Sequence, residues 1–375
     1  MREFPIQEYL QDLKTLCAID SGNQNAAGTR AVADFFEERY RALGLKVERK
    51  YQTGNDFAPF VTVQNAGDGP FDVLFVAHMD TVFPVGTGAE RPFEVDKDNV
   101  GHGPGCVDCK GGCLIIYYLI KALLEENALN FHFCVGMNSD EERGSQYSRA
   151  FFDEIARKSN YCFVFEPGRP NDEYVSRRKG GASYLIRCHG IAAHSGVEPE
   201  KGASAILELA KWVTELYQLV DYEKGTTLNI GRFQGGADNG SVPDYAEFTL
   251  SFLYMDETAL EPLQSMLQRM REHPFDGRTQ IEIEEKVMRP PMTPTPATWE
   301  LLHQLSEAAR EAGTTAEHLC TGGGSDGNYI APLGPVTLDG CGPCGGKLHT
   351  RDEYLKVDTV ALRYETMFRL LKKLF

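Results

Sequence analysis

Continuous apolar runs alternate with helical patterns through the first half of the chain. The run Asp72–His78 is short and apolar almost throughout, as expected of a strand buried on both faces of a parallel sheet. Similar runs follow at 131–138 and 161–165. Apolar residues recur at helical spacing in the segments that precede or separate these runs, namely 29–43, 111–127 and about 144–157. This alternation predicts an α/β fold with a mixed, mostly parallel sheet flanked by helices.

The pattern changes near Arg177. The chain then shows a strand, a helix, two strands, a helix and a strand, in the segments 177–190, 202–219, 226–233, 245–255, 257–271 and 280–288. That order is typical of a ferredoxin-like α+β domain. A proline cluster at 289–298 marks the return to the first domain. We therefore predict one domain of residues 1–179 and 289–375, interrupted by an inserted domain of residues 180–288.

Charge and composition limit the kinds of binding partner that are expected for this chain. Acidic residues outnumber basic ones by 54 to 38 in the 375-residue chain, which gives a formal net charge of −16. Nucleic acid and anionic membranes attract clustered Lys and Arg, so neither is an expected partner. The first segment, 1–20, has apolar residues at helical spacing and lacks the long apolar run of a signal peptide or a membrane span.

Cysteine usage favours the cytoplasm. Ten cysteines would suggest a disulfide framework in a short secreted chain. This chain is long, shows no export signal, and has Cys113, Cys134 and Cys162 inside apolar runs. We therefore expect buried, reduced thiols and a cytoplasmic protein.

Candidate chemistry appears where the predicted strands end. His78 and Asp80 are two residues apart on an extended chain, so their side chains point to the same side. The histidine is suited to hold a metal, with Asp80 behind it fixing the imidazole tautomer. Glu166 ends a later strand. Each signal has an ordinary alternative, because His-x-Asp pairs also occur without a site and a lone Glu in this position is typical of a turn.

Three further clusters lie in loops, and one of them is GGKLHTRDEY, in which His349 follows two glycines. Asp108 stands among five glycines in GHGPGCVDCKGG, and glycines permit close approach of the backbone. Glu141 and Glu142 occur in NSDEERGS, where acids also complement a helix dipole. Ligands of α/β sheets bind at the carboxyl ends of the strands, so these side chains are expected to meet at one edge. Two histidines and three carboxylates suit two zinc ions that share one carboxylate. The five candidate ligands are His78, Asp108, Glu142, Glu166 and His349.

An ordered set of motifs extends over nearly the whole chain: AHMDTV, GHGPGCVDCKGG, SDEERGS, FEPG, RRKGGASYLIRCHGIAAHSG, GGGSDGNY and GGKLHTRDEY. In these motifs the sequence resembles the di-zinc exopeptidases, a family that includes bacterial glutamate carboxypeptidases, acetylornithine deacetylase, succinyl-diaminopimelate desuccinylase and peptidase T. The resemblance is greatest to the glutamate carboxypeptidase branch.

The resemblance implies a role for each candidate ligand. His78 and Glu166 would bind one Zn²⁺, Glu142 and His349 the other, and Asp108 would bridge them. Co²⁺ or Mn²⁺ are expected substitutes. The resemblance also implies a cis peptide between Asp108 and Cys109. Glu141 would be the general base that takes a proton from the attacking water.

The inserted domain acquires a function through the same resemblance. It would serve as a lid and as the dimerisation surface of a homodimer. Its His194 would reach the active site of the partner subunit and stabilise the developing oxyanion. Asn239 would contact the substrate, and the glycine-rich loop would line the substrate pocket through Gly323, Gly324 and Ser325.

One position departs from the family pattern. Many relatives carry Asp-x-Arg on the strand after Asn239, and that arginine grips a substrate carboxylate. Here the triplet is Ser251-Phe252-Leu253, and leucine cannot pair with a carboxylate. Either Arg232 or Lys347 takes over, or the substrate is neutral or bulky at that end. The second alternative is favoured, because neither cation stands at the matched position.

The sequence thus predicts a zinc-dependent hydrolase that cleaves an amide bond near the C-terminus of a small peptide or an N-acyl amino acid. An N-acyl amino acid deacylase with the same site is the alternative. A thiol redox protein using Cys341 and Cys344 of CGPC, with Cys106 and Cys109 as a second pair, is a more distant one. The segment after CGPC does not have a helical pattern, whereas a redox cysteine needs a helix N-terminus. A non-catalytic relative is disfavoured by the presence of Glu141.

Overall fold

The computed structural model describes residues 3–22, 24–54 and 57–375. Contacts divide the chain into two compact units. Unit 1 comprises the residues up to Arg177 together with Met292–Thr321 and Ser325–Phe375. Unit 2 comprises Arg178–Pro291 and Gly322–Gly324.

The main sheet of unit 1 has the strand order β1-β2-β6-β3-β7-β14. Its strands are β1 (Lys46–Lys50), β2 (Phe60–Gln64), β3 (Phe71–His78), β6 (Phe133–Asn138), β7 (Ser159–Val164) and β14 (Val336–Leu338). β3 runs parallel to β6 and β7, and β14 runs parallel to β7. β1 and β2 pair antiparallel at one edge. The predicted mixed, mostly parallel sheet is confirmed.

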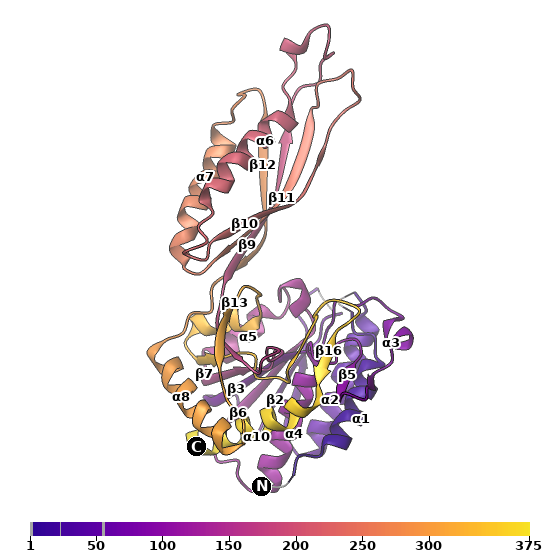
Figure 1. Ribbon diagram of the computed structural model, residues 1–375, viewed down its shortest axis with the longest axis vertical. Coiled ribbons are helices and arrows are strands. Elements are labelled where there is room, and N and C mark those ends of the chain that lie inside the picture. Colours follow the sequence, from indigo (N-terminus) through magenta and orange to yellow (C-terminus); the bar gives the residue numbers. More distant parts are fainter. Residues whose placement is uncertain (1–2, 23, 55–56) are drawn as a thin grey trace. The chain divides into compact units, whose positions relative to one another are not determined.

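Helices cover both faces of this sheet (Figure 1). In the described residues, the helices of unit 1 are α1 (Ile6–Cys17), α2 (Ala26–Ala42), α3 (Thr87–Glu90), α4 (Lys110–Glu125), α5 (Arg149–Ala156), α8 (Pro296–Glu311), α9 (Asp326–Ile330) and α10 (Val357–Leu374). Along β3, Phe75 packs in the larger core cluster, whereas its neighbours Leu74 and Val76 pack in a second cluster with α5 and α9. Burial on both faces explains why β3 reads as a continuous apolar run.

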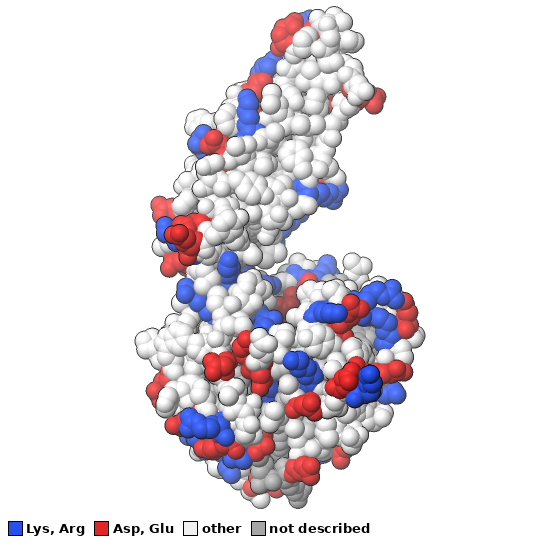
Figure 2. All heavy atoms as spheres, viewed as in Figure 1, with Lys and Arg blue, Asp and Glu red and all other residues white. Residues whose placement is uncertain are grey.

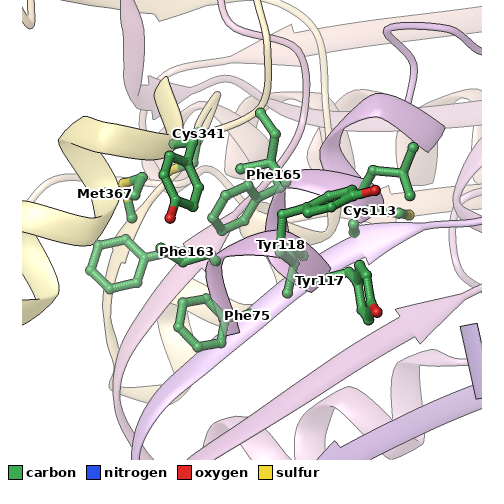
Figure 3. Packing of buried hydrophobic residues seen from close by; sticks show 14 of the residues in the cluster. Phe75, Cys113, Tyr117, Tyr118, Phe163, Phe165, Cys341 and Met367 are labelled. Carbon is green, nitrogen blue, oxygen red and sulfur yellow. The ribbon is translucent and has the colours of Figure 1, made fainter. Parts of the chain in front are cut away.

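α4 is the central helix of the larger cluster. Its side chains are buried from Lys110 to Ile120, so it is apolar on nearly every side, as expected for a helix enclosed by other elements. In Figure 3, Tyr117 and Tyr118 of α4 lie near Phe75 and Phe163 of the sheet, with Met367 of α10 in the same cluster. This packing fixes the start of α4, and with it the loop that carries Asp108.

A small second sheet in unit 1 has the order β15-β16-β5-β4. Its strands are β4 (Glu94–Val95), β5 (Val100–His102), β15 (Gly345–Gly346) and β16 (Tyr354–Lys356). β16 pairs with β5, with Tyr354 opposite His102. The pairing brings the loop after β5 beside the loop between β15 and β16. A further pair joins β13 (His318–Thr321) to β8 (Tyr174–Arg178).

Unit 2 contains the predicted order of elements. They are β9 (Gly180–His189), α6 (Ala205–Leu216), β10 (Thr227–Gly235), β11 (Tyr245–Tyr254), α7 (Leu260–Glu272) and β12 (Gln280–Arg289). The strands form an antiparallel sheet in the order β10-β11-β9-β12. Alternate residues of β9, such as Tyr184 and Ile186, are buried against Trp212 of α6 and Leu263 of α7. The ferredoxin-like arrangement is confirmed.

The helix starts follow ordinary capping chemistry. The Ser204 hydroxyl accepts a hydrogen bond from Leu207 N–H and so caps α6, and Thr295 forms a capping box with Thr298 at the start of α8. α8 contains Trp299, and α10 ends at Leu374.

Surface charge, the state of the cysteines and the apolarity of the helices were also predicted or constrained by the sequence. On the face shown in Figure 2, acidic and basic side chains are interspersed. The ten cysteines of the described chain are all free, and all but Cys320 are buried, as expected from their apolar surroundings. None of the helices within the described ranges combines the length and the apolarity needed to cross a bilayer.

Candidate metal centre

Three neighbouring parallel strands deliver candidate ligands to one edge of the main sheet. His78 is the last residue of β3 and lies opposite Asn138, the last residue of β6. After β6 comes the short 3₁₀ turn Glu141–Arg143, which carries Glu142. Glu166 follows the end of β7 by two residues. The shared edge expected for an α/β sheet is therefore where these side chains gather.

Two loops bring the remaining candidate ligands to the same place. His78 Nε2 lies 3.0 Å from Asp108 Oδ1 and 3.5 Å from Glu166 Oε1. His349 Nε2 lies 3.3 Å from Asp108 Oδ2 and 3.1 Å from Glu142 Oε2. Each oxygen of Asp108 thus faces a different histidine. The predicted cis peptide between Asp108 and Cys109 is confirmed.

The ligand atoms form two overlapping groups. One contains His78, Asp108, Cys109 and Glu166, and the other contains Asp108, Glu142 and His349; in each, the ligand atoms lie within 4.8 Å of one another. Only Asp108 belongs to both groups as they are found in the described residues. A nitrogen-and-carboxylate set with one shared carboxylate fits two adjacent zinc ions.

The charges within the two ligand groups also favour the binding of cations. Burial acts to raise the pKa of Asp108, but hydrogen bonds from His349 and His78 outweigh it and hold that pKa below its usual range. Hydrogen bonds to Asp108 and Glu142 raise the pKa of His349 to about 10. Burial raises the pKa of Glu142. The Asp108 carboxylate therefore favours positive charge at the site.

Asp80 does more than the sequence indicated. His78 Nδ1 lies 3.1 Å from the main-chain oxygen of Asp80 and 3.4 Å from its Oδ1. Because the carbonyl oxygen can only accept, Nδ1 carries the proton and Nε2 is left to bind a metal. The Asp80 carboxylate also accepts hydrogen bonds from the main-chain N–H groups of Glu141 (3.2 Å) and Glu142 (3.1 Å). Asp80 thus contacts the candidate ligand His78 and holds the turn of the predicted base.

Two of the predicted substrate residues lie together in unit 2. His194 is exposed, and its Nδ1 accepts hydrogen bonds from the N–H groups of Gly196 and Val197, both at 3.1 Å. Ser195 donates from Oγ to the main-chain oxygen of Asn239 at 3.2 Å. The loops that carry His194 and Asn239 are therefore joined, although they are 45 residues apart in sequence.

The glycine-rich loop is divided between the units. Gly323 and Gly324 belong to unit 2, and the Arg178 guanidinium donates to their main-chain oxygens at 3.1 and 3.3 Å. Ser325 belongs to unit 1, where it is fully buried and caps α9. Its hydroxyl donates to Asp339 Oδ2 at 2.5 Å and accepts from Gly327 N–H. The described contacts of Ser325 are thus all within the fold.

Leu253 lines a cavity of about 220 Å³ in unit 2 that also contains Lys179 and Arg289. Leu253 lies opposite Gly181 on β9, and Gly181 lies opposite Arg289 on β12. Residues directly opposite across strands share one face of a sheet, and Gly181 has no side chain to separate the other two. The residues that line this cavity, all from the described ranges, do not include Arg232 or Lys347. Sequence reasoning missed Arg289 because it lies on another strand than Leu253.

Cys341 and Cys344 lack two features of a redox site, a lowered pKa and a position at the start of a helix. Burial raises the pKa of the Cys344 thiol to about 11 and raises that of Cys341 well above its usual value. Burial likewise raises the pKa values of Cys106 and Cys109. Cys341 and Cys344 lie in the loop before β15, not at the start of a helix. A reactive thiol requires a lowered pKa.

Residues 74–373 match the family model described as Peptidase family M20/M25/M40. The chain belongs to this family. It is therefore a hydrolase of the peptidase and amidohydrolase type, and the resemblance found in the sequence motifs is confirmed.

Curated relatives with different reactions match over almost the whole chain. Carboxypeptidase G2 of Pseudomonas sp. (strain RS-16) is 27% identical over 369 residues, which cover 97% of this chain and 89% of the relative. Succinyl-diaminopimelate desuccinylase of Hydrogenovibrio crunogenus is 26% identical over 382 residues, which cover 94% of this chain and 95% of the relative.

Solved structures of the family share the fold. The aminopeptidase PepT of Bacillus cereus superposes with a TM-score of 0.79 at 23% identity and covers 99% of both chains. The YxeP protein of Bacillus subtilis, described as a dinuclear metal-binding peptidase of the M20 family, superposes with a TM-score of 0.67 at 15% identity and covers 98% of both chains.

Proposed function

We propose that this protein is a two-zinc hydrolase that cleaves an amide bond near the C-terminus of a small peptide or an N-acyl amino acid. The observation that carries the proposal is the position of Asp108, which turns one carboxylate oxygen toward each of two histidines. The reactions named for carboxypeptidase G2 and for the desuccinylase both break an amide bond, which supports the same bond type here.

Each candidate ligand would bind one of two ions or both. His78 and Glu166 would hold one ion and Glu142 and His349 the other, with Asp108 shared between them. Bound ions supply Lewis acidity, which lowers the pKa of water and polarises a carbonyl. Co²⁺ or Mn²⁺ would substitute for Zn²⁺.

Glu141 is the proposed general base. Its side chain is buried, at 8% exposure, and it immediately precedes the ligand Glu142 in the same turn. It would take a proton from the attacking water and give it to the leaving amine. Hydrogen bonds from the Glu141 and Glu142 N–H groups to Asp80 keep the base and the ligand in a fixed relation.

We propose that residues 1–179 and 289–375 form the catalytic domain and that residues 180–288 form a lid and dimerisation domain. In a homodimer, His194 would act on the substrate held by the partner subunit. Because its Nδ1 accepts two main-chain N–H groups, a neutral His194 carries its proton on Nε2. An exposed Nε2–H is a suitable donor to a developing oxyanion. Asn239, in the adjoining loop, would contact the substrate.

The set of free cysteines favours a cytoplasmic location.

The residues around the cavity of Leu253 favour a substrate that has a free carboxylate. Arg289 shares the sheet face of Leu253, and Lys179 lines the same cavity. A guanidinium binds a carboxylate through two parallel hydrogen bonds. We therefore propose that Arg289, rather than Arg232 or Lys347, takes the place of the arginine that Leu253 replaces.

A hydrolysis screen tests this function. The metal-free protein is loaded with Zn²⁺ or Co²⁺ and assayed on dipeptides, N-acetyl amino acids and N-succinyl amino acids, with the Glu141→Gln variant as the control. We expect metal-dependent release of an amino acid by the wild type and none by the variant. Preference for dipeptides identifies a peptidase, and preference for acyl amino acids identifies a deacylase. Equal hydrolysis by the wild type and the variant would refute the proposal.

A further inference from the structure

Glu353 is a buried carboxylate beside the candidate metal centre that is not a member of either ligand group found in the described residues. It lies four residues after His349 and immediately before β16, and it is 1% exposed. A buried acid is costly unless strong hydrogen bonds satisfy it, so its partners show what it does.

The carboxylate of Glu353 accepts three main-chain hydrogen bonds from a single loop. Oε2 accepts from Gly105 N–H at 2.9 Å, and Oε1 accepts from Val107 N–H at 3.0 Å and Asp108 N–H at 3.1 Å. The last of these donors belongs to the shared ligand itself. Hydrogen bonds from N–H groups to a carboxylate are stronger than those between neutral groups.

The loop that donates these bonds has little freedom of its own. Gly105 adopts a φ of +70°, and a Cβ at this position would lie 2.7 Å from Thr81 Cγ2. In this conformation successive N–H groups point inward to one spot, which forms a concave site for an anion. Unsatisfied buried N–H groups would destabilise the loop, and Glu353 supplies the negative acceptor.

The same carboxylate joins two loops that hold different ligands. Asp108 follows β5, whereas His349 and Glu353 lie between β15 and β16, and β16 pairs with β5. Asp108 and His349 both contribute to the second ligand group. The distance between them therefore depends on how these two loops are held together.

We propose that Glu353 is a positioning residue of the metal centre: its carboxylate fixes the Asp108 loop against the His349 loop, so that Asp108 presents one oxygen to each ion. This inference rests on the proposed two-metal function. Glu353 would act through the main chain of this loop, because its oxygens accept from the N–H groups of Gly105, Val107 and Asp108.

Glu208 provides a matched control. It is also a buried carboxylate, at 2% exposure, with three donors: Trp212 Nε1 at 2.8 Å, Phe275 N–H at 2.7 Å and Asp276 N–H at 2.8 Å. It lies in unit 2 and belongs to neither ligand group. Glu208→Gln thus removes the same kind of acceptor without touching a ligand loop.

The test compares Zn²⁺ and Co²⁺ binding by metal-stripped wild type, Glu353→Gln and Glu208→Gln, measured in competition with a chromophoric chelator. Gln has one acceptor oxygen and turns an NH₂ group toward a loop N–H, so Glu353→Gln should weaken binding of at least one ion by tenfold or more. Its Co²⁺ absorption spectrum at saturation should also change. Glu208→Gln should bind both ions as the wild type does, even though both variants unfold at a lower temperature.

Wild-type affinity and an unchanged Co²⁺ spectrum in Glu353→Gln would overturn the proposal. Failure of the wild type to bind Zn²⁺ at all would instead refute the proposed function. Glu353→Asp keeps the charge with a shorter reach, and a partial recovery of affinity is expected. If neither variant folds, deuterium exchange on metal-free wild type decides. We expect slow exchange in peptides that span 103–110, and fast exchange there would show that Glu353 does not hold the loop.

Discussion

Most candidate residues of the two units are held in opposite ways, although His349 of unit 1 lies on a loop and is exposed like those of unit 2. In unit 1, His78, Asp108 and Glu166 are all at least nine-tenths buried and lie within hydrogen-bond range of one another or of Asp80. In unit 2, His194 and Asn239 are exposed and lie on loops joined by main-chain hydrogen bonds and one from the Ser195 side chain. Buried polar groups must be fully satisfied, which makes the first arrangement rigid and specific.

The difference suggests a division between chemistry and substrate choice. Changes in unit 1 should affect metal binding or turnover, because each side chain there supports another. Changes in unit 2 should leave the metals in place and alter activity or specificity. The following experiments test this division, from the largest expected effect to the smallest.

Glu141→Gln and Glu142→Gln distinguish the base from the ligand. Glu141→Gln should reduce kcat by at least about a hundredfold, the usual contribution of a general base, and keep its full metal content. Glu142→Gln should lose affinity for one ion. Metal analysis after gel filtration, together with kcat, measures both effects. The reverse pattern would show that the two roles are exchanged.

His194→Ala should lower kcat by about a hundredfold, as expected on removal of an oxyanion donor, and should retain zinc. A mixture of His194→Ala and Glu141→Gln should recover activity, since a mixed dimer contains one complete site. Unmixed variants at equal concentration are the control. No recovery after subunit exchange would contradict action across a dimer.

Asp80→Asn should lower metal affinity or kcat by about tenfold to a hundredfold, the scale for a group that orients a ligand histidine. The Glu141 and Glu142 N–H groups donate to different carboxylate oxygens, and in the amide one of these two positions is an NH₂ group, which cannot accept. Chelator competition and steady-state kinetics measure the two quantities. Unchanged values for both would show that Asp80 is dispensable to the centre.

Arg289→Ala tests the carboxylate site of unit 2. The wild type should prefer an acyl amino acid over its carboxamide, and Arg289→Ala should lose that preference by about tenfold, since hydrogen bonds to charged groups contribute about 1.5–3 kcal/mol. Arg232→Ala is the control, because its guanidinium hydrogen-bonds the Gln234 side chain on β10. Leu253→Arg should restore the preference in the Arg289→Ala background. A wild type without any preference would favour a neutral substrate end instead.

Much of the main fold could be predicted from the sequence because burial leaves a local pattern. β3 is apolar along its length since both of its faces are covered, and β9 alternates since only one face is. The same reasoning led to the candidate ligands at the strand ends, such as His78 and Glu166, because parallel strands end at a common edge. The motifs then assigned a role to each.

The short strands could not be predicted in this way. β5 and β16 have three residues each, too few to show a period, and they exist because they pair with each other across about 250 positions of the chain. β1 is largely polar and only partly buried, so it has no apolar run. In both cases the pairing partner, not the local sequence, determines the strand.

The sequence by itself determined the fold class, the family and the identities of the candidate ligands, because these depend on local burial patterns and on motifs. Only the tertiary structure decided which acceptor each buried donor uses. In the sequence, nothing distinguishes Glu353 from the other acidic residues near His349. In the structure, its carboxylate accepts hydrogen bonds from a loop 245 to 248 positions away. Arg289 faces the cavity of Leu253 because β9 pairs with both β11 and β12 in one register. Register and loop packing are set by contacts between distant segments, and no local pattern records them.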